Sequence, residues 1–188
     1  MKTSTPPQTR GIFVCIVGPS GAGKDTLIRL ARAKLGDDQS FFFPRRLVTR
    51  PLSPFEDHGI LSPEQFEAGV RDGLFALHWR AHGLGYAIER TILSAIALGK
   101  IVVCNVSRDA IAAAQQNFAD VKIVCVTAPE AVIAARLTAR GRDAPADFAE
   151  RLSRNASYLA EIKADITIVN IGEQAEAVDA LTRFLTAL

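Results

Sequence analysis

The feature that most constrains this chain is a glycine-rich segment, Gly18 to Asp25, with the sequence Gly-Pro-Ser-Gly-Ala-Gly-Lys-Asp. The continuous apolar run Ile12 to Val17 precedes it and predicts a strand that is buried on both faces. Apolar residues at helical spacing follow it and predict a helix: Leu27, Leu30, Ala31 and Leu35. A strand, a glycine loop with a lysine and a helix, in this order, are typical of a phosphate-binding loop.

Every residue of this loop is a candidate ligand for a nucleoside triphosphate. Glycines let the backbone curl so that successive N–H groups point at phosphate oxygens, and the helix N-terminus adds about half a positive charge. Lys24 would reach the β- and γ-phosphates as a mobile point charge. The predicted triphosphate-binding residues of the loop are Gly18, Pro19, Ser20, Gly21, Ala22, Gly23, Lys24, Asp25 and Thr26.

One position departs from the usual loop pattern. Asp25 stands where a serine or threonine hydroxyl normally meets Mg²⁺, and Thr26 follows it. A carboxylate is a hard oxygen ligand, so Asp25 could hold Mg²⁺ directly or through water. Aspartate also stabilises the start of a helix, by about 0.3–1 kcal/mol. The sequence leaves both interpretations of Asp25 open, as a magnesium ligand and as a helix cap.

Strand-like and helical patterns alternate along the rest of the chain and predict an α/β fold, with a parallel sheet flanked by helices. Further strands are expected at Ile101–Val106, Val121–Thr127 and Ile166–Val169. Helices are expected at Asp109–Phe118, Pro129–Arg140 and Ala146–Ile162, and from Glu173 onward. Ser62 and Gln65 form a capping box that predicts a short helix. Residues 1–10 are expected to be a loose tail and residues 11–188 a single domain.

Composition narrows the class of protein. Hydrophobic residues make up 48% of the 188 residues, and the net charge of +2 gives no indication of a nucleic-acid partner. No segment approaches the ~18 continuous apolar residues of a membrane span. The three cysteines, Cys15, Cys104 and Cys125, lie in apolar runs without metal-ligand spacing. They are expected to be buried, reduced thiols, as in a cytoplasmic protein.

Motifs along nearly the whole chain resemble those of the guanylate-kinase-like P-loop kinases. Val48 to Pro51 is similar to the segment that grips the acceptor's phosphate, and Phe75 to Tyr86 to the tyrosine-bearing strand and turn. Arg136 to Arg142 resembles the arginine-rich lid. The resemblance implies a P-loop fold with an acceptor-binding region at about 41–98 and a lid at about 136–154. It also implies that Asn170 lies near the nucleotide base.

Within that group, the chain looks most like the ribose 1,5-bisphosphate phosphokinases. Five segments carry this resemblance: Gly23-Lys24-Asp25, Glu56-Asp57-His58, Leu77 to Leu84, Asn105-x-Ser107-Arg108 and Arg140-Gly141-Arg142. The resemblance implies ATP with Mg²⁺ and ribose 1,5-bisphosphate as substrates. The implied product is 5-phosphoribosyl 1-diphosphate, made in connection with phosphonate breakdown.

The residues expected to bind the acceptor agree with a sugar bisphosphate. Guanylate kinases read guanine with acidic side chains, and an approximate alignment gives Leu77 and Asn105 at those places. A site without those carboxylates should not select guanine strongly. A bisphosphate instead needs cationic groups, for which the planar fork of arginine is well shaped. The predicted acceptor ligands are Arg46, Thr49, Arg50, His58, His82, Tyr86, Asn105 and Arg108.

The expected catalytic residues are all cationic: Lys24, Arg136, Arg140, Arg142 and Arg151. A phosphate monoester with a second pKa near ~6 is already mostly ionised at pH 7, so no general base is needed. Aligning the two anions could contribute ~7–11 kcal/mol. Each arginine also has a simpler interpretation, as part of a solvated helix face or of a surface ion pair.

Two other functions remain open on the sequence alone. One is a guanylate kinase or another nucleoside-monophosphate kinase, which shares the loop and the lid. The other is a non-catalytic nucleotide-binding module, against which the complete set of Gly18, Gly21, Gly23 and Lys24 argues. The sequence leaves the oligomeric state open between monomer and homodimer.

Overall fold

The computed structural model describes residues 11–51, 57–139, 162–171 and 174–188. It confirms the predicted α/β class, with one sheet of five strands and one of four. The five-stranded sheet has the order β2-β7-β1-β8-β9, and the four-stranded sheet has the order β4-β3-β6-β5. The chain divides into two compact units. Among the described residues, we call 11–14, 37–51, 57–104 and 109–121 the sheet unit, and 15–36, 105–108, 122–139, 162–171 and 174–188 the loop unit.

The five-stranded sheet consists of β1 (Ile12–Val17), β2 (Phe41–Phe42), β7 (Ile101–Asn105), β8 (Val121–Thr127) and β9 (Ile166–Val169). The pairs β2 with β7 and β8 with β9 are parallel. All six residues of β1 are buried, as expected for a central strand. The predicted strands at β8 and β9 are confirmed with the same bounds, and β7 ends one residue before its prediction.

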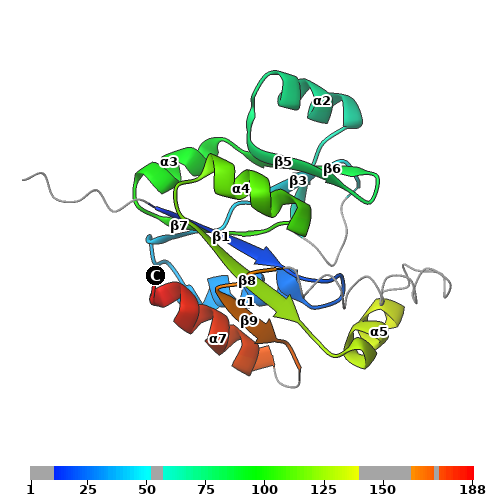
Figure 1. Cartoon of the computed structure of the whole chain (residues 1–188), viewed down its shortest axis with the longest axis vertical. Coiled ribbons are helices and arrows are strands. Elements are labelled where there is room, and N and C mark those ends of the chain that lie inside the picture. Colours follow the sequence, from blue (N-terminus) through cyan, green and yellow to red (C-terminus); the bar gives the residue numbers. More distant parts are fainter. Residues whose placement is uncertain (1–10, 52–56, 140–161, 172–173) are drawn as a thin grey trace, which may run out of the picture. The chain divides into compact units, whose positions relative to one another are not determined.

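Helices α1 (Lys24–Leu35), α5 (Glu130–Ala139) and α7 (Gln174–Thr186) belong to the loop unit. Helices α1 and α7 lie side by side, and α7 also contacts β9 (Figure 1). Helix α7 buries Val178, Leu181 and Leu185. Fully burying a leucine side chain stabilises a fold by about 1.5–3 kcal/mol. The predicted helix at Ala146–Ile162 falls among residues 140–161, which lie outside the described part of the chain.

The four-stranded sheet of the sheet unit consists of β3 (Arg46–Val48), β4 (His58–Ile60), β5 (Phe75–Ala81) and β6 (Leu84–Glu89). Strand β3 runs parallel to β4 and antiparallel to β6, which forms a hairpin with β5. The hairpin turn consists of His82 and Gly83, both with positive φ, at 51° and 71°. Positive φ at both central residues is the two-residue turn that matches the twist of the strands.

Three α-helices of the sheet unit are α2 (Pro63–Arg71), α3 (Thr91–Ala97) and α4 (Ile111–Asn117). The predicted capping box of α2 is confirmed, because the Ser62 hydroxyl accepts from the Gln65 N–H and the Gln65 side chain accepts from the Ser62 N–H. The helix expected at Asp109–Phe118 is a 3-10 turn, Arg108–Ala110, followed by α4. Within the described residues, no helix has the length and apolar character that crossing a membrane requires.

Candidate active site

The phosphate loop takes the backbone form that its glycines predict. Gly18, Gly21 and Gly23 have φ angles of 143°, 83° and 90°, which L side chains rarely adopt. A Cβ on Gly18 would overlap the backbone carbonyl of Val126, and one on Gly23 would lie 2.5 Å from Nδ2 of Asn170. Glycine at 18 and 23 therefore satisfies both the backbone angle and the close approach of neighbouring atoms.

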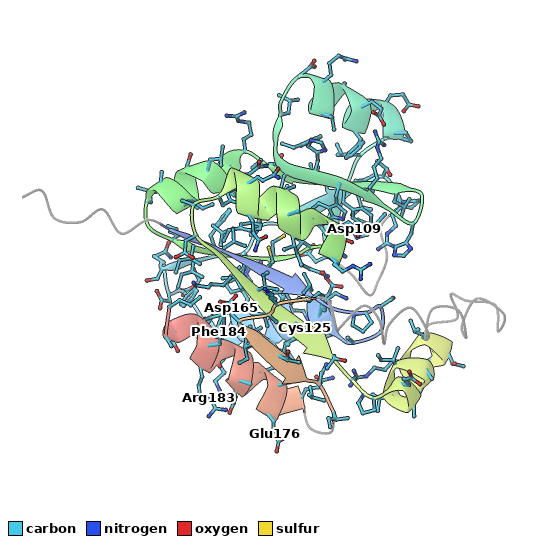
Figure 2. All side chains as sticks on the ribbon, in the orientation of Figure 1. Asp109, Cys125, Asp165, Glu176, Arg183 and Phe184 are labelled. Carbon is cyan, nitrogen blue, oxygen red and sulfur yellow. The ribbon has the colours of Figure 1, made fainter. Side chains whose placement is uncertain are left out.

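Lys24 is the first residue of α1, and its ammonium folds back over the loop. Nζ donates to the carbonyl of Gly18 at 2.7 Å and to that of Pro19 at 2.9 Å. Its charge also acts on Cys125, a buried thiol of β8 (Figure 2). Burial raises the pKa of Cys125, and the positive charge of Lys24 opposes that rise. The ammonium is thus held against the loop whose phosphates it is expected to reach.

Two further polar side chains brace the loop by donating hydrogen bonds to one of its backbone carbonyls. Arg136 on α5 donates from Nη1 to the Ala22 carbonyl at 3.3 Å and from Nη2 to the Asn170 carbonyl at 3.2 Å. Asn170, which follows β9 and is 6% exposed, donates from Nδ2 to the Ala22 carbonyl at 2.7 Å. Its own N–H donates to the Thr127 carbonyl at 2.6 Å. The ends of β8 and β9 and the helix α5 are therefore tied to one turn of the loop.

Asp25, on helix α1, accepts a hydrogen bond from a side chain at the end of strand β7. Nδ2 of Asn105, the last residue of β7, donates to Oδ1 of Asp25 at 2.7 Å. Asn105 is 7% exposed, and both residues belong to the loop unit. Sequence reasoning grouped Asn105 with the acceptor ligands and gave no signal for this pair.

Two of the expected acceptor ligands of the sheet unit, Arg46 and Tyr86, lie at an aromatic stack. Trp79 and Tyr86 stack at 5.4 Å between ring centroids with an interplanar angle of 5°. The Arg46 guanidinium lies 5.7 Å from the centroid of the Tyr86 ring, on the neighbouring strand β3. Tyr86 is 8% exposed, so the stack fixes its ring. This arrangement presents a cation and a phenol on adjacent strands.

The segment after β3 is tied down at both ends. Thr49 exchanges hydrogen bonds with Gly85 of β6: its N–H donates at 3.0 Å, and its Oγ1 accepts from the Gly85 N–H at 2.8 Å. His58 is completely buried, and its Nε2 lies 3.2 Å from the Pro51 carbonyl. The Arg45 guanidinium donates to the His58 carbonyl at 2.9 Å. His58 therefore supports the Thr49-Arg50-Pro51 segment from inside the fold.

The comparisons with known proteins agree with these features. The guanylate kinase family profile matches residues 10–188. The chain is 48% identical over 177 residues to ribose 1,5-bisphosphate phosphokinase PhnN of Methylobacterium radiotolerans, which covers 94% of this chain and 98% of that protein. The chain belongs to the guanylate kinase family, in its ribose 1,5-bisphosphate phosphokinase branch. The resemblance inferred from the motifs is confirmed.

Other relatives of this branch and a solved structure extend the result. The chain is 50% identical over 162 residues to ribose 1,5-bisphosphate phosphokinase PhnN of Bradyrhizobium diazoefficiens, covering 86% of this chain and 81% of that protein. The crystal structure of guanylate kinase from Anaplasma phagocytophilum superposes with a TM-score of 0.69 at 16% identity, covering 96% of this chain and 87% of that one. At this identity the likeness shows the shared fold alone. It confirms the guanylate-kinase-like fold predicted for this chain.

The remaining residues that the sequence singled out for acceptor binding and for the lid lie in different places. His82 is an exposed residue at the hairpin turn, and Arg108, the first residue of the 3-10 turn, belongs to the loop unit. Leu77 is 1% exposed within β5 and carries no polar atom in its side chain. The expected lid arginines Arg140, Arg142 and Arg151 lie outside the described residues.

Proposed function

We propose that this chain transfers the γ-phosphoryl group of ATP to ribose 1,5-bisphosphate and so forms 5-phosphoribosyl 1-diphosphate and ADP. The observation that carries the proposal is its identity, at about half of all positions and along nearly the whole chain, to enzymes named for this substrate. The braced phosphate loop supports the donor half of the reaction. The cation and phenol of the four-stranded sheet support the acceptor half.

The proposed transfer needs positioning more than acid–base chemistry. An oxygen of the acceptor's 1-phosphate forms a bond to the γ-phosphorus, while the bond from that phosphorus to the β–γ bridging oxygen breaks. Because a phosphate with a pKa near ~6 is largely ionised at neutral pH, no side chain has to remove a proton. Lys24, Arg136 and the lid arginines would supply the positive charge that lets the two anions approach.

Asp25 fits the magnesium ion that ATP is proposed to bring. In proteins Mg²⁺ commonly takes one or two carboxylates together with substrate phosphates, so one carboxylate beside the loop is sufficient. The ion, when bound, would neutralise charge that develops on the β- and γ-phosphates. Asp25 is the second residue of the helix that starts at the loop lysine, where a carboxylate is close to the expected phosphates.

We assign the acceptor's phosphates to Arg46, Arg50 and Tyr86. Arg46 and Tyr86 lie on the paired strands β3 and β6, and Arg50 follows β3 by two residues. Arginine forks bind phosphate oxygens in pairs, and a phenol donates one hydrogen bond. We propose that the reaction takes place during phosphonate breakdown, which would supply ribose 1,5-bisphosphate as the substrate.

A product assay tests the proposal directly. Purified protein is incubated with ATP and Mg²⁺ and either ribose 1,5-bisphosphate or GMP, and ³¹P NMR follows the products. The expected result is a diphosphate on the sugar carbon C1 together with ADP. A Lys24→Met variant serves as the control for contaminating kinases. Turnover of GMP without turnover of the sugar would show a nucleoside-monophosphate kinase instead.

A further inference from the structure

The Asp25 carboxylate and the Asn105 amide form a side-chain pair at the start of α1. Nδ2 of Asn105 donates to Oδ1 of Asp25 at 2.7 Å, although the residues are 80 positions apart in sequence. The N–H of Val106 donates to the carbonyl of Ile16 at 3.1 Å, which ties the end of β7 to β1. The amide therefore reaches Asp25 from a fixed strand end, with little freedom to move.

Helix capping does not account for this pair. Gly23 is the N-cap residue of α1, so Asp25 lies in the first turn, two positions further on. A carboxylate anywhere in the first turn gains from the helix dipole, and that gain needs no partner side chain. A buried asparagine from a distant strand that donates to one carboxylate oxygen instead fixes the direction of that carboxylate. This is the arrangement expected where the carboxylate is a ligand.

The chemistry of the partner points the same way. The neutral amide of Asn105 orients the Asp25 carboxylate through a hydrogen bond and adds no positive charge of its own. Groups that orient metal ligands in this way are part of metal sites, and their loss typically lowers metal affinity about 10–100-fold.

We propose that Asn105 is a positioning residue that aims Asp25 at the Mg²⁺ accompanying ATP. The pair then takes the place of the serine or threonine hydroxyl that usually follows the loop lysine. This inference rests on the proposed use of ATP with Mg²⁺, and it assigns Asn105 to the donor side of the reaction. On this basis, Asp25, which stands where a hydroxyl residue is usual, and Asn105 form one functional unit.

Calorimetry separates the magnesium-dependent part of binding from the rest. ADP is titrated into wild type and into Asn105→Ala, with Mg²⁺ and again with EDTA. We expect Asn105→Ala to weaken Mg²⁺–ADP binding about 10–100-fold and to leave binding in EDTA nearly unchanged. Asp25→Asn should reduce the same magnesium-dependent part. Adding Asn105→Ala to Asp25→Asn should then change little, because the two residues act as one unit.

A hydroxyl at position 25 provides a sharper comparison. Asp25→Ser restores the usual ligand type, so magnesium dependence should persist but should no longer respond to Asn105→Ala. Asn105→Ser repeats the test with a small polar residue if the alanine variant is unstable. The matched control is Asn117→Ala, which removes an amide that donates to the Ala76 carbonyl in the sheet unit.

The inference is overturned by equal losses of ADP binding with and without Mg²⁺, or by additive effects of Asp25→Asn and Asn105→Ala. In either case Asn105 would shape the loop rather than the metal ligand. These outcomes are distinct from failure of the proposed function. The calorimetry uses no sugar substrate, so its result does not depend on whether the product assay detects turnover of ribose 1,5-bisphosphate.

Discussion

The loop unit and the sheet unit hold their functional side chains by different means. In the loop unit, Lys24, Arg136 and Asn170 donate to carbonyls of the loop, and Asn105 donates to Asp25. In the sheet unit, Arg46 lies over Tyr86, and Tyr86 is stacked on Trp79. The first arrangement fixes backbone groups and charges, whereas the second holds a guanidinium over two stacked, buried rings.

This difference has a functional consequence. A triphosphate is bound largely by backbone N–H groups, so its site depends on the shape of a short chain segment. An acceptor with phosphates at separate positions is bound by side chains, so its site depends on where strands place them. Substitutions in the loop unit should therefore act on ATP, and substitutions in the sheet unit should act on the sugar and on stability.

The largest effect is expected for Lys24→Met. It removes the ammonium placed over the loop, and the loss of one preorganised hydrogen-bond donor that stabilises transition-state charge typically lowers kcat about 10²–10³-fold. Lys34→Met is the matched control, because Lys34 lies on the same helix and pairs with the exposed Asp179. Steady-state rates with ATP and ribose 1,5-bisphosphate measure both. A loss of activity in Lys34→Met as large as that in Lys24→Met would contradict a specific role of the loop lysine.

Arg136→Met is expected to raise the KM for ATP about 10–100-fold. The substitution removes the charged donor that joins the Ala22 carbonyl to the Asn170 carbonyl, and such charge-assisted bonds contribute about 1.5–3 kcal/mol. The KM for the sugar should change much less, and initial rates at varied concentrations of each substrate test this. If instead the KM for the sugar rises equally, the division of labour between the two units fails.

The acceptor side is tested by Thr49→Val. This change leaves the buried Gly85 N–H without its hydroxyl acceptor, and an unsatisfied buried donor costs about 1–3 kcal/mol. Urea unfolding should show that loss of stability, together with a raised KM for the sugar and a nearly constant KM for ATP. Thr49→Ser keeps the hydroxyl and should behave like wild type. An unchanged stability of Thr49→Val would show that the hydrogen bond contributes nothing net.

Local sequence signals predicted the loop and much of the five-stranded sheet. Gly18 to Lys24 are neighbours in the chain, and the capping box of Ser62 and Gln65 spans four consecutive residues. The strands β2, β3 and β4 were missed because two or three residues show no alternation, and only pairing with distant strands makes them strands.

The contacts that define the site were beyond sequence reasoning for the same physical reason. Asn105 meets Asp25 only because β7 lies beside β1 in the sheet. Arg136 has the spacing of a solvated helix face, and its contact with the loop carbonyls depends on where α5 packs. His58 follows two acidic residues, which favours a surface position, yet on β4, which pairs with β3, its side chain is completely buried.

The smallest effect concerns the ion pair between α1 and α7, which belongs to the loop unit but does not brace the loop. The hydrogen bond from Lys34 holds the pKa of Asp179 below its ordinary value of 3.8. A lowered carboxyl pKa contributes stability above the unfolded value, and that contribution is lost as the pH falls through the folded value. Asp179→Asn should therefore lower Tm slightly at pH 7 and match wild type at pH values below the lowered pKa.

Salt provides the second arm of this test, because both partners of the pair are about half exposed. At 1 M NaCl the Debye length falls to about 3 Å, so the difference in Tm between wild type and Asp179→Asn should largely disappear. The KM for ATP should be the same in both proteins at every salt concentration. A KM that follows the ion pair would mean that the α1–α7 contact also sets the position of the loop. Bracing would then extend through the whole loop unit, beyond Arg136 and Asn170.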